Sequence, residues 1–170
     1  MNLEVRVLLR WTLIVSVALV LQVGLLNDVR IAGVHPDLML LLAVCAGLTG
    51  GPGEGAGVGF ACGLLLDLFL PGRFGVTALA YALTGYGAGV AGDTVVRPAR
   101  WISVGLVVVS SALGTLLYAA IGQLLGQRSL SDPRLGVIIG IVSVINGALS
   151  LPALAVCRWA DHDPVRARLR

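Results

Sequence analysis

The amino-acid sequence predicts an all-α integral membrane protein. We expect one transmembrane domain over residues 1–170, with six membrane-spanning helices and both termini in the cytoplasm. The composition is 57% hydrophobic and 12% charged, against about 25% charged in soluble domains. Apolar residues fall in six stretches, most of them long enough to cross a bilayer as helices. The 12 basic residues are all Arg and lie at or beyond the ends of those stretches, so we interpret them as topology signals.

The first predicted span covers residues 8–26 and follows Arg6. No small-residue cleavage site stands at its end, so we interpret it as a retained span rather than a cleaved signal peptide. Gln22 is near that end, where it is placed to bond either to a neighbouring helix or to lipid headgroups. The following loop ends in Pro36, which suits a first helical turn, and Asp37, whose charge suits a helix N-terminus.

The second predicted span, residues 36–49, is short. As a helix it covers about 21 Å, against a hydrocarbon core of about 30 Å, so it is either a short crossing or a re-entrant element. Arginine counts distinguish the two topologies. Six crossings place 8 Arg in the cytoplasm and 4 outside, whereas five crossings place 5 inside and 7 outside. Because Arg is enriched in cytoplasmic loops, we predict six crossings.

The tryptophans give the same orientation. Trp11, Trp101 and Trp159 all fall at the cytoplasmic ends of predicted spans under the six-crossing topology. Indole rings are favoured at the boundary between lipid and water. We therefore expect all three rings at the cytoplasmic interface.

The third and fourth predicted spans, residues 54–70 and 75–92, form a hairpin rich in small residues. These residues recur three or four positions apart, so each set lies roughly on one helical face. In a bilayer, such a face lets backbones approach closely. We predict helix packing or partner contact for Gly55, Gly59 and Gly63 in the first arm, and for Gly75, Ala78, Ala82, Gly85 and Gly89 in the second.

Asp67 is the carboxylate at the end of the first arm. Polar groups at membrane depth are candidates for function. One interpretation makes Asp67 a residue that caps the adjoining turn or reaches toward Arg73. The other makes it a contact between helices or proteins, or a ligand for a proton or a substrate.

The fifth and sixth predicted spans cover residues 101–125 and 135–157. Asn146 falls in the middle of the sixth, where we expect it to hydrogen-bond to another helix of the chain. Pro152 should kink that helix and free a backbone carbonyl. From Arg158 the chain is basic, and we interpret this tail as an anchor on anionic headgroups.

The sequence offers few groups for catalysis. His35 and His162 fall in loops on opposite sides of the predicted membrane, and no nucleophile elbow, HExxH motif or phosphate-binding loop is present. The net charge of +3 is too small and scattered for a nucleic-acid surface. Three cysteines lie in or at the end of apolar spans and are interpreted as packing residues. We therefore expect no cofactor, no metal, no nucleic-acid partner and no enzymatic activity.

Several segments, in this order, resemble the rod shape-determining protein MreD family. They are His35–Leu38, Gly55–Asp67, Pro71–Gly75, Ala80–Tyr86 and Asn146–Pro152. Each motif is apolar and weak by itself, and the order and spacing give the resemblance its specificity. Chain length and the six-span pattern agree with it.

The resemblance implies a non-catalytic scaffold of the cell-elongation machinery in the bacterial cytoplasmic membrane. Its implied partners are the single-span protein MreC and a peptidoglycan polymerase paired with a class B penicillin-binding protein, with an MreB filament as a further implied partner. The family resembles in fold the substrate-binding subunits of energy-coupling-factor transporters. The alternative function is therefore a small-molecule-binding transporter subunit, although aromatic residues, at 5%, offer little pocket lining.

Overall fold

The computed structural model describes residues 3–25, 35–69, 74–95, 100–126 and 133–161. Within these ranges the chain is helical and contains no strand, which confirms the predicted all-α class. The elements are α1 (Leu3–Val20), continued by the π-helical η1 (Leu21–Leu25), then α2 (Leu38–Gly50), α3 (Pro52–Phe69), α4 (Val76–Thr94), α5 (Arg100–Leu124) and α6 (Leu135–Asp161).

Each predicted span coincides with a helix, and the boundaries differ by a few residues. The largest differences are the start of α1, at Leu3 rather than residue 8, and the end of α6, at Asp161 rather than residue 157. Three helices are long and apolar enough to cross a membrane, over Val5–Gly24, Arg100–Leu124 and Leu135–Asp161. The predicted loop and tail positions Arg30, Arg73, Arg97, Arg128 and His162–Arg170 lie outside the described residues.

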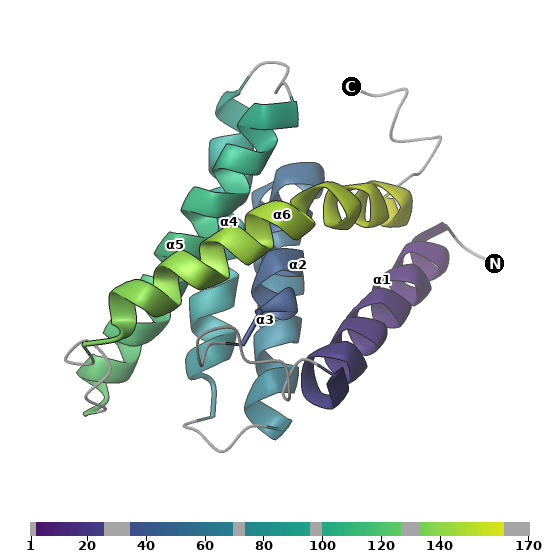
Figure 1. Cartoon of the computed structure of the whole chain (residues 1–170). Helices are drawn as coiled ribbons and strands as arrows, with labels where there is room; N and C mark the ends of the chain where they lie inside the picture. Colours follow the sequence, from purple (N-terminus) through teal and green to yellow (C-terminus); the bar gives the residue numbers. More distant parts are fainter. Residues whose placement is uncertain (1–2, 26–34, 70–73, 96–99, 127–132, 162–170) are drawn as a thin grey trace.

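The helix α2 lies at the centre of the molecule (Figure 1). It contacts α3, α4, α5 and α6, and more lightly α1. Nine consecutive residues, from Met39 to Gly47, are buried. A helix that is apolar on every side is expected to be surrounded by protein. The burial of α2 among the other helices agrees with this expectation.

The helices α3 and α4 are in contact at their backbones. A Cβ added at Gly59 would lie 2.7 Å from the Tyr81 carbonyl carbon, and one added at Gly63 would lie 2.5 Å from the Ala78 Cα. Ordinary carbon contacts are about 3.5–4.0 Å. A residue with a side chain at either position would push the two helices apart. The glycines of the first arm thus meet the second arm of the same hairpin.

The close contact extends to α2. A Cβ at Gly85 would lie 2.7 Å from the Gly55 carbonyl carbon and 3.0 Å from the Ala43 carbonyl oxygen, so α4 touches α3 and α2 at one residue. Gly47 of α2 faces the same point, because a Cβ added there would meet the Gly85 carbonyl oxygen and would lie 2.9 Å from the Gly89 nitrogen. Three helices therefore meet at their backbones, and we call α2, α3 and α4 the glycine core.

The outer helices present apolar side chains outward. Leu8 of α1 is 65% exposed, Leu113 of α5 is 58% exposed and Val144 of α6 is 68% exposed. The helix α6 contains Pro152 and changes direction along its length (Figure 1), as expected where a proline removes a helical hydrogen bond. Apolar faces of this kind suit lipid or the membrane helix of a partner.

Candidate functional site

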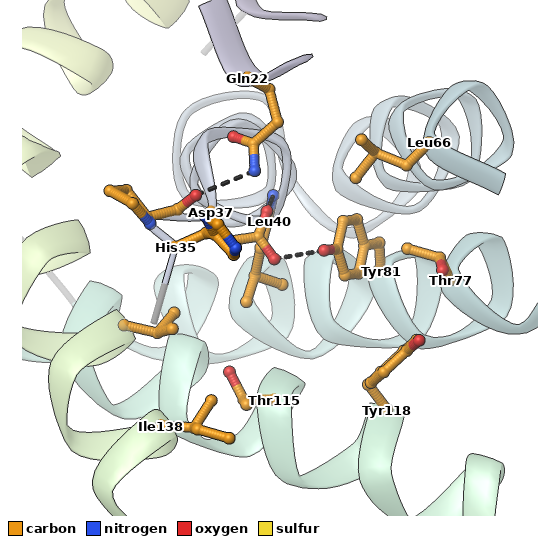
Figure 2. A pocket seen from close by; sticks show the side chains of 12 residues that line it. Gln22, His35, Asp37, Leu40, Leu66, Thr77, Tyr81, Thr115, Tyr118 and Ile138 are labelled. Atoms are coloured by element: carbon orange, nitrogen blue, oxygen red, sulfur yellow. Dashed lines mark hydrogen bonds between the residues drawn. The ribbon is translucent and has the colours of Figure 1, made fainter. Parts of the chain in front are cut away.

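A cavity of about 320 Å³ opens beside the first turn of α2 (Figure 2). Helices α3, α4, α5 and α6 and the π-helical end of α1 also line it, so six elements meet there. The lining combines polar and apolar side chains: Gln22, His35, Pro36, Asp37, Leu40, Leu66, Thr77, Tyr81, Thr115, Tyr118, Ile138 and Val142.

Asp37 supplies the carboxyl group of this pocket. It is the N-cap of α2, and its Oδ1 accepts a hydrogen bond of 3.0 Å from the Leu40 backbone nitrogen. Its Oδ2 accepts a hydrogen bond from the Tyr81 hydroxyl of α4 (Figure 2). The carboxylate therefore caps one helix and joins it to another. Pro36 precedes this cap and is not in the first helical turn, so that detail of the prediction is wrong.

Gln22 fixes the chain on the other side of Asp37. Its Nε2 donates to the Pro36 carbonyl oxygen, and its Oε1 accepts from the Leu38 nitrogen, both at 2.9 Å. Leu38 opens α2, and the first N–H groups of a helix have no partner within it. Gln22 thus supplies one of these partners. Of its two predicted roles, a bond to a neighbouring helix and a contact with lipid headgroups, the structure shows the bond to the start of α2.

Asp67 lies at the turn between α3 and α4. Its Oδ2 accepts hydrogen bonds from the Gly75 nitrogen at 2.7 Å and the Ala78 nitrogen at 3.3 Å. Gly75, the N-cap of α4, has a φ of 93° and no side chain to offer, so the carboxylate of the preceding helix takes that role. The charge also lies at the positive end of the α4 dipole. This geometry supports the first interpretation of Asp67, in which the side chain caps the adjoining turn.

Asn146 is buried between α5 and α6. Its Nδ2 donates a hydrogen bond of 3.1 Å to Ser111 Oγ, so it joins two helices of the chain in the way the sequence predicts. Its Oδ1 has no hydrogen-bond partner in the described part of the chain. Neither Asn146 nor Pro152 lines the pocket beside α2. These two predicted residues serve the packing and shape of α6.

A second polar cluster joins the start of α1 to the end of α6. Trp11 Nε1 donates to Glu54 Oε1 and to Asp161 Oδ1, both at 3.0 Å, and Thr49 Oγ1 donates to Asp161 Oδ2 at 3.0 Å. Trp11 is only 8% exposed. The ring is therefore enclosed by the protein, and its level at the cytoplasmic interface stays a prediction. Trp101, 85% exposed, presents its ring outward.

Sequence reasoning missed the pocket itself. Tyr81, Thr77, Tyr118 and Thr115 line it, and each appears in the sequence as an isolated polar side chain within an apolar stretch. The available signal was the exclusion of free polar groups from lipid. That rule indicates that these hydroxyl groups point into the protein, but it does not indicate which of them lie together. The three cysteines behave as predicted, since Cys45, Cys62 and Cys157 are free and buried.

The fold and these sites together define a class of protein: a helical membrane protein with a close-packed core, whose polar side chains mainly cap and join helices. The comparison with protein families gives the particular family. The model of the rod shape-determining protein MreD matches residues 5–146, which is most of the chain. The chain belongs to this family and is a rod shape-determining membrane protein. No curated protein and no solved structure gives a match, and the likeness to energy-coupling-factor subunits stays a prediction.

Proposed function

We propose that this protein is a non-catalytic scaffold of the cell-elongation machinery in the bacterial cytoplasmic membrane. The glycine core is the observation that supports the proposal. Its helices touch at backbone atoms, with Gly85 against Gly55 and Ala43. Such a core has few side-chain rotamers to rearrange. Close-packed protein interiors have low compressibility, so the positions of these helices relative to one another are held fixed. A protein that holds others in place needs this property.

The proposed partners are a single-span MreC-like protein, a peptidoglycan polymerase with its class B penicillin-binding protein, and an MreB filament on the cytoplasmic face. The added Cβ of Gly75 meets nothing within 4 Å, but the other predicted stripe glycines meet backbone atoms of the hairpin or of α2 and are not available to a partner helix: Gly55, Gly59, Gly63, Gly85 and Gly89. The contact would instead use outward apolar faces, such as those of Leu113 and Val144. Helix association in a bilayer relies on close packing and on polar contacts of about 0.6 kcal/mol on average.

We further propose six membrane crossings with both termini in the cytoplasm. Two exposed residues at opposite ends of α4 test this topology, Phe74 just before the helix and Thr94 at its end. With six crossings, Phe74→Cys reacts with an impermeant maleimide in intact spheroplasts, and Thr94→Cys reacts only after permeabilisation. The native cysteines are buried and give a low background. With five crossings the two results exchange.

Affinity purification from native membranes in mild detergent tests the scaffold. Recovery of MreC-like and wall-synthase proteins in stoichiometric amounts supports it. Gly85→Leu should lower that recovery, whereas Gly87→Leu should not, because Gly87 has no atom within 4 Å of its added Cβ. Unchanged recovery with Gly85→Leu would contradict the role of the core.

The pocket beside α2 favours a second candidate, a small-molecule-binding transporter subunit. A volume of about 320 Å³ is at the lower end for a ligand site, and two tyrosines with Asp37 and Gln22 offer directional polar contacts. Co-purification of an ATPase pair together with a bound small molecule would establish this candidate in place of the scaffold.

A further inference from the structure

A groove with two arginines lies between the start of α5 and the last turns of α6. Its volume is about 320 Å³. It shares no lining residue with the pocket beside α2. The α5 side supplies Arg100 and Ser103, and the α6 side supplies Leu151, Leu154, Ala155 and Arg158.

The two guanidinium groups have no ion-pair partner within 4 Å among the described residues. Neither Arg100 nor Arg158 forms an ion pair or a hydrogen bond there. Arg10 differs from both, since it donates to the Trp159 carbonyl oxygen at 3.2 Å and lies 4.8 Å from the centre of that indole ring. Two guanidinium groups from different helices that line one groove favour an anionic occupant.

The position of Arg100 strengthens this inference. It is the first residue of α5, and a helix N-terminus carries partial positive charge and unpaired N–H groups. A cation is mildly disfavoured at this end of a helix, and a bound anion would offset that effect. Arg158, in the last turn of α6, adds a second guanidinium from the opposite wall. An anion in the groove would meet both side chains and the first turn of α5.

The surroundings identify the class of anion. Each arginine is followed by an exposed indole, Trp101 at 85% and Trp159 at 52%, and such rings mark the level of the lipid headgroups. In the two turns of α6 that precede Arg158, Leu151, Leu154 and Ala155 give the groove apolar lining. Basic pockets between membrane helices bind anionic lipid headgroups.

We propose that this groove binds one anionic phospholipid, with Arg100 and Arg158 on its negatively charged headgroup and the acyl chains along Leu151 and Ala155. The bound lipid would tie the start of α5 to the end of α6. This gives the basic end of α6 a specific recognition site, whereas the sequence indicated only a general anchor. The proposal does not depend on the partners of the scaffold.

Native mass spectrometry of the detergent-solubilised full chain tests the proposal. The protein is mixed with equal amounts of phosphatidylglycerol and phosphatidylcholine that carry the same acyl chains. We expect one retained phosphatidylglycerol per chain. Arg100→Gln and Arg158→Gln should each lower its retention relative to phosphatidylcholine by about fivefold, as expected from about 1 kcal/mol per basic residue near an anionic surface. Circular dichroism and size-exclusion profiles establish that each variant is folded.

Three controls separate this site from other causes. Arg6→Gln removes an exposed charge outside the groove and should leave retention unchanged. Ala155→Trp fills the groove without a change of charge and should lower retention, whereas Val144→Trp, at a 68% exposed position of α6, should not. Equal loss with Arg6→Gln, no loss with Arg100→Gln and Arg158→Gln, or full displacement of the lipid by inorganic phosphate would each overturn the proposal.

Discussion

Gly85→Ala is the sharpest perturbation of the glycine core, because it adds one methyl group where two helices press against α4. The new carbon would lie 2.7 Å from the Gly55 carbonyl carbon and 3.0 Å from the Ala43 carbonyl oxygen. Both neighbours are backbone atoms, so no flexible side chain can turn away. Relief requires α3 or α2 to move by about 1 Å relative to α4, if carbon contacts return to about 3.5–4.0 Å.

The magnitude follows from two opposing effects. Overpacking costs about 1–3 kcal/mol, and backbone contacts on both sides place this site at the upper end of that range. Replacement of Gly by Ala in a helix returns up to about 1 kcal/mol. We therefore expect Gly85→Ala to lower the free energy of unfolding by about 2 kcal/mol.

Gly87→Ala is the matched control. It lies two residues away in the same helix, and its added Cβ has no atom within 4 Å. It should leave the protein equally stable or stabilise it by up to about 1 kcal/mol. The two variants should therefore differ by about 3 kcal/mol in a reversible unfolding titration in mixed micelles. Equal unfolding free energies for both would refute the backbone packing of α2, α3 and α4.

Three further predictions use the same titration. Asp67→Ala removes the acceptor of the Gly75 and Ala78 nitrogens and should cost about 0.5–2 kcal/mol; a smaller loss would refute its capping role. Trp11→Phe removes the N–H between Glu54 and Asp161 and should cost about 1–3 kcal/mol, with a neutral result contradicting the cluster. Asp37→Asn and Tyr81→Phe share one hydrogen bond, so a double-mutant cycle should give a coupling energy of about 0.5–3 kcal/mol, and simple additivity would argue against that bond.

Local patterns predicted the helices well. Apolar length located each one, and the spacing of Gly55, Gly59 and Gly63 correctly indicated a face that tolerates only small residues. The partner of that face was less predictable. Gly47, which completes the contact between α2 and α4, is the single glycine of the predicted second span, residues 36–49. Its importance comes from the crossing of three helices, and a single helical pattern does not contain that information.

Long-range polar contacts were beyond the sequence for the same reason. Asp37 and Tyr81 are separated by 44 residues, and Trp11 and Asp161 by 150. Rules for helix termini placed Asp37 at a helix N-terminus, because that placement depends on neighbouring residues only. They gave no reason to pair it with one particular tyrosine. The pocket beside α2 follows from such pairings, so it appeared only in the assembled fold.

Cell shape tests the central claim most directly, namely that this chain holds the elongation machinery through a fixed glycine core. In a rod-shaped bacterium without its own copy of the protein, the chain is supplied as wild type, Gly85→Leu or Gly87→Leu at equal membrane levels. We predict rods with the wild type and with Gly87→Leu, since a side chain at residue 87 meets open space, and rounded cells with Gly85→Leu, since residue 85 meets backbone. Normal length-to-width ratios with Gly85→Leu would contradict the account.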